Sequence, residues 1–447
     1  MNRLKCRHPG GISMVVTNRQ ASEIKAAAWH TQANGMMDLV IRNAVLDRSG
    51  ELVEVGITNG RITAVSTSTL PLGDLEIDAG GAMISPALIE PHFHLENALI
   101  WEGALNHSGT LHEAIEVYAA IKRDMELDDL VRRASIALDV AIANGVQWFR
   151  SHVDIDRTAQ LHLLRGNIAV REKYKDLIDI QLIAFPQMGM ARDPEVMDLM
   201  WQAMESGADI VGGMPHAERD MDDAARHIEI AFDMAKARDA DIDMHIDETD
   251  DPYWHSLELL ADQTIENGWH GRVSAGHCCA MSAWDNALAE RVIAKVAEAR
   301  INVITMAPIN LMLEGRGDSH PKRRGIARVK ELLQAGVNVT CGQDDLQNMF
   351  YSFGSMDPLE VALIAAHAAH MSAPQEIEAA FDMPRYNAAK NFRLADYGIF
   401  EGARANLLVI DANSAVDALR RRGDRLYVIR DGRILTQSKT TIQRHYA

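Results

Sequence analysis

The sequence predicts a (β/α)8 TIM barrel with a small β-sandwich domain formed from both chain ends. Within residues 87–401, eight apolar, β-branched runs alternate with amphipathic stretches of helical length. Near the two ends of the chain, the segments ITNGRITAV and VIRDGRILT are similar to each other. Serial β/α units indicate a parallel sheet covered by helices, and two matched ends indicate one domain that flanks an insert. We expect a loose extension at residues 1–36, the β-sandwich at residues 37–86 and 402–447, and the barrel at residues 87–401.

Each terminal segment contains a two-residue turn signal between apolar alternations. Asn59-Gly60 and Asp431-Gly432 each combine residue types that tolerate positive φ, as tight hairpin turns require. The sequence therefore predicts one hairpin near each end of the chain. The expected strands of this domain are residues 38–46, 52–58, 61–65, 407–411, 426–430 and 433–436.

The eight runs of the insert end at polar residues, many of them metal-binding types. These ends are predicted near His94, His152, Gln187, His216, His245, His277, Asn310 and Asp344. Crossover helices are predicted, among others, at residues 128–143, 221–238 and 285–300. An open doubly wound sheet is the alternative, but no G-x-G-x-x-G follows the first strand. The active site of a (β/α)8 barrel lies at the C-terminal strand ends, where these side chains would collect.

Composition and charge narrow the class of partner. The chain has 447 residues, 47% of them hydrophobic, and a formal net charge of −18. That charge disfavours nucleic acid or an anionic membrane as the main partner, because both are polyanions. No apolar run reaches the roughly 18 residues that a transmembrane helix needs. We expect a cytoplasmic protein whose partner is a small molecule.

The four cysteines do not form a metal-binding pattern. Cys278 and Cys279 are adjacent, Cys6 and Cys341 lie far from them, and no C-x-x-C spacing occurs. A thiolate zinc site is therefore not expected. Free thiols are typical of a reducing compartment, in agreement with a cytoplasmic location.

Four residues are candidate metal ligands. His92 and His94 form an H-x-H pair at the end of the first strand, and side chains at i and i+2 of a strand share one face. His245 ends the fifth strand as a third nitrogen ligand, and Asp344 at the end of the eighth strand adds an oxygen. Nitrogen and oxygen ligands without thiolate suit one catalytic Zn(II) or Fe(II) ion with an open position for water.

Other polar strand ends are assigned differently. Glu248 lies just past His245, where its carboxylate could turn over the metal. The third and fourth strands end at Gln187 and His216, so no lysine is present there to bridge two metals, which favours a mononuclear site. His152 and His216 are expected to be structural, because histidines at strand ends often hydrogen-bond backbone groups.

With these residues in place, the chain resembles the cytosine deaminase group of the amidohydrolase superfamily from about Asp38 to the C-terminus. The segments that carry the resemblance include IEPHFHLE, NHSGTLHEAIE, IDIQLIAFPQMG, ADIVGGMPH, IDMHIDETDD, RVSAGHCCAM and PKRRGIARVKELLQAGVNVTCGQDD. The resemblance implies metal binding by His92, His94, His245 and Asp344. It also implies that Glu248 and His277 are the catalytic pair, and that Gln187 and Asp345 hold the heterocycle.

The resemblance implies a hydrolytic deaminase in which an activated water attacks the ring carbon that bears an exocyclic amine. Glu248 would move the proton from the water to a ring nitrogen. His277 would stabilise the developing oxyanion, and Asp345 would help to protonate the departing ammonia. Three positions depart from the group: Gln343 replaces a usual His, Glu96 a usual Asp, and Phe350 an expected Trp. All three lie close to the expected substrate, and Phe350 is itself an expected substrate-binding residue, so the identity of the ring stays open.

Several alternatives stay open beside a cytosine-like substrate. The same site could hydrolyse another C–N bond, in a triazine, creatinine, a pterin or an N-alkylamino ring. A catalytically inactive barrel that serves as a scaffold is a second class, although all expected ligands and acid-base residues are present. A nucleic-acid deaminase is disfavoured, since the chain is acidic and lacks a basic, aromatic-rich stretch. A homo-oligomer is possible by the resemblance alone.

Overall fold

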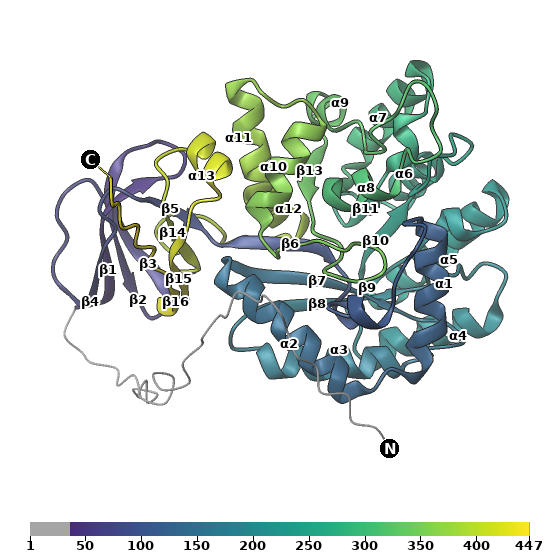
Figure 1. Ribbon diagram of the computed structural model, residues 1–447, viewed down its shortest axis with the longest axis horizontal. Coiled ribbons are helices and arrows are strands. Elements are labelled where there is room, and N and C mark those ends of the chain that lie inside the picture. Colours follow the sequence, from purple (N-terminus) through teal and green to yellow (C-terminus); the bar gives the residue numbers. More distant parts are fainter. Residues whose placement is uncertain (1–35, 447) are drawn as a thin grey trace. The chain divides into compact units, whose positions relative to one another are not determined.

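The computed structural model describes residues 36–446, and the extension predicted at residues 1–36 lies outside this range except for Met36. Eight parallel strands follow one another in the order of the sequence to form the barrel sheet (Figure 1). An isolated parallel bridge between Phe93 and Asp344 connects the first strand to the segment after the last. The barrel strands are β6 (Leu88–Phe93), β7 (Val146–Asp154), β8 (Asp179–Phe185), β9 (Ile210–Val211), β10 (Asp241–Ile246), β11 (Val273–His277), β12 (Asn302–Thr305) and β13 (Asn338–Cys341).

Helices connect the barrel strands and pack on the outside of the sheet (Figure 1). The predicted helices at residues 128–143, 221–238 and 285–300 correspond to α2, α5 and α7. The helices are α1 (Leu111–Ile121), α2 (Leu127–Ala143), α3 (His162–Tyr174), α4 (Pro194–Ser206), α5 (Met221–Arg238), α6 (Ser256–Glu266), α7 (Asn286–Ala299), α8 (Ala307–Leu313), α9 (Val329–Gln334), α10 (Pro358–Ala368), α11 (Pro374–Asp382), α12 (Ala388–Asn391) and α13 (Ala415–Arg421). The six short helical turns are η1 (Leu95–Asn97), η2 (Trp101–Gly103), η3 (Lys122–Asp124), η4 (Pro215–Ala217), η5 (Cys279–Ser282) and η6 (Met383–Asn387).

Strand β7 shows how the barrel interior is built. All nine of its residues are buried, as expected for a parallel strand covered on both faces. Arg150, His152 and Asp154 alternate along it and therefore share one face. Buried polar groups need hydrogen-bond partners, and each of the three has one: Arg150 binds Asp243 at 2.9 Å, His152 contacts the candidate ligand His92, and Asp154 accepts from the buried Lys122.

The predicted ends of the fourth and seventh strands are wrong. Strand β9 ends at Val211, and His216 lies in the short turn η4. Strand β12 ends at Thr305, and Asn310 lies inside α8. In the second case Pro308 stands in the first turn of α8, where a missing N–H costs no hydrogen bond, so an apolar run that reads as one strand contains a strand and a helix start.

The strands from both chain ends form one domain, as predicted. Its eight strands belong to a single hydrogen-bonded sheet rather than two, because β1 pairs with β4 near its start and with β5 near its end. The strands are β1 (Met37–Leu46), β2 (Leu52–Thr58), β3 (Arg61–Ser66), β4 (Gly73–Asp78), β5 (Met83–Pro86), β14 (Leu407–Ile410), β15 (Arg425–Arg430) and β16 (Arg433–Gln437).

Both predicted hairpins are confirmed. Asn59 and Gly60 connect β2 to β3 with φ values of 51° and 74°, and Asp431 and Gly432 connect β15 to β16 with φ values of 48° and 72°. Two successive positive φ values are the signature of the type I′ turn, whose twist matches that of the flanking strands.

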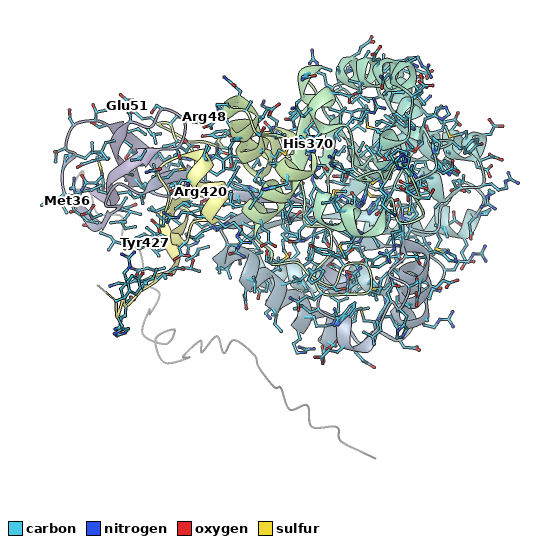
Figure 2. The ribbon with its side chains drawn as sticks, turned by 45° about the horizontal axis from the view of Figure 1, so that its top comes forward. Met36, Arg48, Glu51, His370, Arg420 and Tyr427 are labelled. Carbon is cyan, nitrogen blue, oxygen red and sulfur yellow. The ribbon has the colours of Figure 1, made fainter. Side chains whose placement is uncertain are left out.

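A buried ion pair connects the terminal sheet to the helical part of the barrel. Arg385 of η6 contacts Asp47 at 2.5 Å, and both side chains are 1% exposed. Figure 2 labels the neighbouring Arg48. Its Cζ atom lies 3.9 Å from the ring centre of Tyr386, and its Nη2 atom lies 2.8 Å from Asp382 Oδ2.

Two further features concern the described part of the chain. Cys278, Cys279 and Cys341 are buried free thiols, whereas Cys6 lies outside the described residues. Within residues 36–446, none of the helices combines the length and the apolar character that crossing a membrane requires.

Candidate active site

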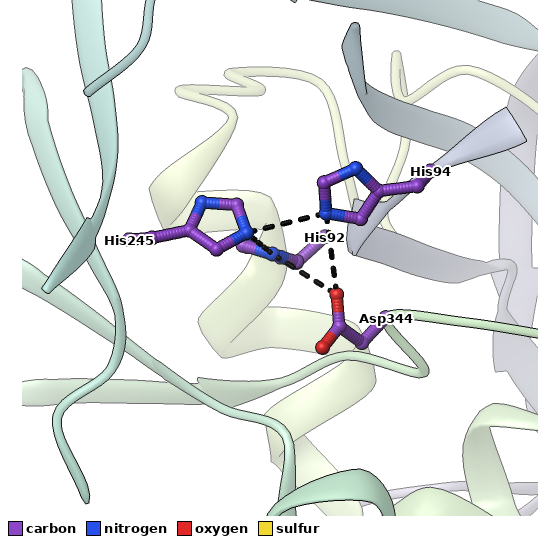
Figure 3. Close-up of side chains that lie close together, drawn as sticks. All are labelled: His92, His94, His245 and Asp344. Carbon is purple, nitrogen blue, oxygen red and sulfur yellow. Dashed lines mark hydrogen bonds and ion pairs between the residues drawn. The ribbon is translucent and has the colours of Figure 1, made fainter. Parts of the chain in front are cut away.

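Four side chains for which the sequence predicts metal binding converge at the C-terminal end of the barrel (Figure 3). The Nε2 atoms of His92 and His94 each lie 3.2 Å from Nε2 of His245. Oδ1 of Asp344 lies 3.4 Å from both His92 Nε2 and His94 Nε2. All four residues are buried, so the cluster brings three imidazoles and a carboxylate together away from solvent.

The spacing of these atoms fits a divalent cation. A tetrahedral shell with bonds of about 2.1 Å separates neighbouring ligand atoms by about 3.4 Å. No hydrogen-bond donor among the described residues reaches Asp344 Oδ1. Burial lowers the pKa values of His92, to about 4, and of His94 and His245. Neutral imidazoles with lone pairs directed at one point are the form in which histidine binds a metal.

Close backbone approach makes room for this cluster. A Cβ atom on Gly342 would lie 3.0 Å from His92 Cβ, and one on Gly276 would lie 3.0 Å from His92 Cε1. Glycine at both positions therefore lets β11 and the end of β13 close around the imidazole. Asp344 itself has a φ of 69°, an uncommon conformation for a non-glycine residue and one that clusters at functional sites.

Glu248 and His277 lie directly beside the metal-ligand cluster. Glu248 Oε1 is 3.2 Å from His277 Nδ1, and His277 Nε2 is 3.9 Å from Asp344 Oδ2. Nδ2 of Asn310 in α8 lies 3.1 Å from His277 Nδ1. His277 Nε2, on the side of Asp344, has no partner in the described part of the chain. His277 can thus donate a hydrogen bond toward the cluster.

Electrostatics distinguishes the carboxyl groups here from ordinary surface acids. Burial raises the pKa of Glu248 well above its usual range, and the carboxylates of Asp344, Glu314 and Asp345 raise it further. Burial likewise raises the pKa of Asp344, to about 8. A divalent cation would counteract both effects, since it is the largest local charge in such a site.

Asp345 and Phe350 are held by a residue that the sequence analysis did not single out. Asn348 donates to Asp345 Oδ1 at 2.5 Å and to Asn97 Oδ1 at 2.9 Å. The Oδ1 atom of Asn348 accepts from the backbone N–H groups of Phe350 and Tyr351 at 2.9 and 3.0 Å. Asn348 is fully buried, so it fixes the loop that carries both expected substrate contacts. The signal in the sequence is weak, because an asparagine after two aspartates reads as a solvated turn.

The cluster opens into a pocket with a narrow inner part and a wider outer part. The inner part, of about 20 Å³, is lined by metal-cluster residues and by Gln187, Glu248, Asp345 and Phe350. The outer part, of about 640 Å³, shares Leu111, Gln187, Met214 and Glu248 with it. All residues with a predicted catalytic or substrate-binding role therefore line one connected space, apart from His277, which lies against Glu248.

The two departures next to the metal cluster have structural partners. Glu90 on β6 accepts from the backbone N–H of His92 and of Gln343, each at 3.1 Å. The side chain of Gln343 therefore plays no part in this contact, and its Oε1 accepts from Ser355. Glu96 accepts from the backbone N–H of Asp154 at 3.1 Å, and burial raises its pKa to about 8.

The two histidines expected to be structural do not bond backbone groups. His152 Nε2 lies 3.1 Å from His92 Nδ1, so it contacts a candidate ligand from behind. Neither ring nitrogen of His216 has a partner among residues 36–446, and burial lowers the pKa of His216 to about 3. His216 lines the outer part of the pocket. The contact of His152 joins two neighbouring strands, β7 and β6, and the sequence does not reveal such a contact.

Comparison with known proteins identifies the family. Residues 75–436 match the amidohydrolase family, which is more than half of the chain. The chain belongs to the amidohydrolase family. The crystal structure of 5-methylcytosine deaminase from Klebsiella pneumoniae liganded with phosphonocytosine matches this amidohydrolase with a TM-score of 0.87 and 35% identity, over 91% of this chain and 100% of that chain.

Two curated relatives match this amidohydrolase over most of their length. The N-isopropylammelide isopropyl amidohydrolase of Pseudomonas sp. (strain ADP) is 26% identical over 91% of this chain and 98% of the relative. The pterin deaminase of Rhizobium rhizogenes is 29% identical over 86% of this chain and 88% of the relative. These matches confirm the predicted superfamily and the predicted class of hydrolase that acts on C–N bonds, and the family together with the buried cluster indicates a divalent metal site.

Proposed function

We propose that this amidohydrolase removes the exocyclic amine of a nitrogen heterocycle, such as a cytosine-like pyrimidine or a related ring, and releases ammonia. The observation that carries the proposal is the buried cluster of three imidazoles and Asp344 with Glu248 and His277 directly beside it. The similarity to 5-methylcytosine deaminase over nearly the whole chain supports this class of substrate.

One divalent cation, Fe(II) or Zn(II), would be held by His92, His94, His245 and Asp344. When bound, such a cation supplies Lewis-acid activation of a water molecule near neutral pH. The protein contributes ligands that are already gathered within hydrogen-bonding distance of one another. Imidazole and carboxylate ligands suit several first-row ions, so the ligand set is compatible with both Fe(II) and Zn(II).

Glu248 is assigned the proton transfer. Its carboxyl group lies beside the metal cluster and also lines the pocket, so it can take a proton from water and give it to a ring nitrogen. One carboxyl can act as base and then as acid because the two steps need opposite protonation states. His277 would donate from Nε2 and stabilise negative charge that develops on the oxygen added to the ring carbon.

Three further residues would bind the ring. Gln187 can donate and accept at once, which suits an N–C=O edge, and Asp345 would bond the amine that departs. Phe350 would pack against the ring as an aromatic contact.

A second candidate is the hydrolysis of an N-alkylamino group from a triazine-like ring. The similarity to N-isopropylammelide isopropyl amidohydrolase, which covers 98% of that protein, favours it. The outer pocket of about 640 Å³ borders Glu248 and has room for a substituent on the leaving nitrogen. The same cluster would serve both reactions, and only the leaving group differs.

The test is release of ammonia from a panel of rings by protein loaded with iron or zinc. Cytosine, 5-methylcytosine, isocytosine, isoguanine, creatinine, pterin and aminotriazines form the panel, with N-isopropylammelide as a source of isopropylamine. Chelator-sensitive ammonia from one ring is the expected result. Release of isopropylamine without ammonia would select the second candidate. If the metal-loaded protein releases neither product from any ring, both candidates are contradicted.

A further inference from the structure

One wall of the inner pocket contains polar atoms that the mechanism above does not use. Tyr118 of α1 and Asp154 at the end of β7 both line the inner pocket. Tyr118 is 2% exposed and Asp154 is 1% exposed. Neither the hydroxyl of Tyr118 nor Oδ1 of Asp154 has a hydrogen-bond partner within the described range. A buried polar atom without a partner is costly, which points to a ligand that supplies the partner.

The wall is held in place by a buried lysine. Lys122, 1% exposed, contacts Oδ2 of Asp154 at 2.5 Å and also pairs with Asp156. Its Nζ lies 5.4 Å from the ring centre of Tyr118. Two carboxylates therefore share one ammonium group, which fixes Oδ2 of Asp154 and leaves Oδ1 as an acceptor. The backbone N–H of Gln187 lies near the same carboxyl and helps to lower its pKa, but it does not meet hydrogen-bond geometry with Oδ1.

The wall lies next to residues that the proposed function assigns to the substrate. The ring of Tyr118 is 6.0 Å from the ring of Phe350 in an edge-on arrangement. Asp154, Gln187 and Phe350 line the same inner space. A ring that contacts Phe350 would thus have the hydroxyl of Tyr118 and the free oxygen of Asp154 at its edge.

We propose that Asp154 and Tyr118 select free heterocyclic bases: Asp154 Oδ1 accepts the hydrogen of a ring N–H, and the Tyr118 hydroxyl donates to a neighbouring ring carbonyl or ring nitrogen. A carboxylate that is paired with an ammonium group can accept hydrogen bonds but cannot donate them. A ring that carries an alkyl group or a sugar on the nitrogen facing Asp154 therefore leaves Oδ1 without a hydrogen bond. The added group would also clash with the wall. A site built to bond a substrate N–H rejects analogues that lack it. This proposal rests on the proposed function and adds a substrate class to it.

The test measures binding rather than turnover, in metal-loaded protein that carries Glu248→Gln so that ligands stay intact. Titration calorimetry gives dissociation constants for cytosine and 1-methylcytosine, and for pterin and 3-methylpterin, in which methylation removes the ring N–H. Asp154→Asn and Tyr118→Phe are added singly. Asp156→Asn is the matched control, because Asp156 shares Lys122 but does not line the inner pocket.

We expect Asp154→Asn to weaken binding of the parent ring by about 10- to 100-fold, as loss of a charged hydrogen bond does, and to change binding of the methylated ring less than about threefold. The ratio of the two dissociation constants, methylated over parent ring, then narrows by about 3- to 100-fold. Tyr118→Phe, which removes a single oxygen, should weaken binding of the parent ring by about 3- to 20-fold. Asp156→Asn should not change the ratio of the dissociation constants of the parent and the methylated ring.

Equal loss for the parent and the methylated ring in Asp154→Asn, together with unchanged affinity in Tyr118→Phe, would overturn the proposal. So would the absence of binding by every ring. If rings bind with the expected discrimination but unsubstituted enzyme releases no ammonia, the proposed function fails and this subsite stands. Ammonia release with discrimination unaffected by both variants would leave the function and remove the subsite.

Discussion

The Nε2 atom of His152 lies 3.1 Å from Nδ1 of His92, a nitrogen that faces away from the metal cluster. This contact fixes the orientation of the His92 ring and the nitrogen that faces the cluster, and partners of this kind typically change metal affinity by about 10- to 100-fold. We therefore expect His152→Leu to weaken metal binding by about that factor. Competition with a chelator of known affinity measures the change.

His112→Leu provides the control for this variant, because the His112 side chain is 85% exposed and pairs with Glu116 at the outer part of the pocket, away from the metal cluster. It removes an imidazole without touching the cluster. Equal metal affinity in His152→Leu and the unsubstituted protein would show that the contact between the two rings has no part in metal binding.

Glu248→Gln should keep the metal and lose most of the turnover. The substitution preserves the size of a buried side chain but removes the proton-transfer group, which typically contributes about 10²- to 10⁴-fold in rate. Steady-state kinetics on the ring identified by the ammonia assay, with metal content determined on the same samples, checks both parts. Turnover like that of the unsubstituted enzyme would rule out Glu248 as the proton carrier.

Removing the cation should lower the melting temperature as well as the activity. A cation would bind the ligand atoms of all four buried residues, which lie close together. A ligand present at about 1,000 times its dissociation constant stabilises the folded state by about 4 kcal/mol. Elemental analysis should find one metal ion per chain. Thermal unfolding before and after chelation measures the shift.

Asp344→Asn serves as the comparison for metal removal. An amide supplies a weaker, uncharged ligand in place of the carboxylate, so chelation should shift its melting temperature much less than that of the unsubstituted protein. Equal shifts in the two proteins would mean that the stabilising cation binds somewhere other than this cluster.

The parts of the fold that local signals specify were predictable from the sequence. Asn59-Gly60 specifies a hairpin turn by residue type alone, and the predicted helix at residues 221–238 agrees with α5. The end of β12 was not predictable in this way. An apolar run does not reveal where strand becomes helix, and the start of α8 at Ala307 depends on how the chain turns out of the barrel after Thr305.

In the candidate site, too, the residues marked by local sequence signals were predictable and those that depend on contacts between distant segments were not. The residue types and their positions at strand ends indicated His92 and His94, since alternation along a strand is a local property. The contacts of His152 and Asn348 depend on which side chains meet across β6, β7 and the loop after β13. A single sequence shows residue order but not such partners, so both read as structural or solvated polar residues.

The last prediction concerns acid stability and His216. Burial lowers the pKa of His216 from 6.5 to about 3, so between these values the unfolded chain holds a proton that the folded chain does not. Stability therefore falls as pH drops below about 6.5, by up to about 1.4 kcal/mol per pH unit.

His216→Gln removes this dependence. Relative to the unsubstituted protein, its free energy of unfolding should improve by about 2 kcal/mol between pH 6.5 and pH 5. Urea unfolding of metal-free protein at both pH values measures the difference, and His112→Gln controls for the loss of an exposed imidazole. A difference that stays constant with pH would mean that His216 is as easily protonated in the folded chain as in the unfolded one.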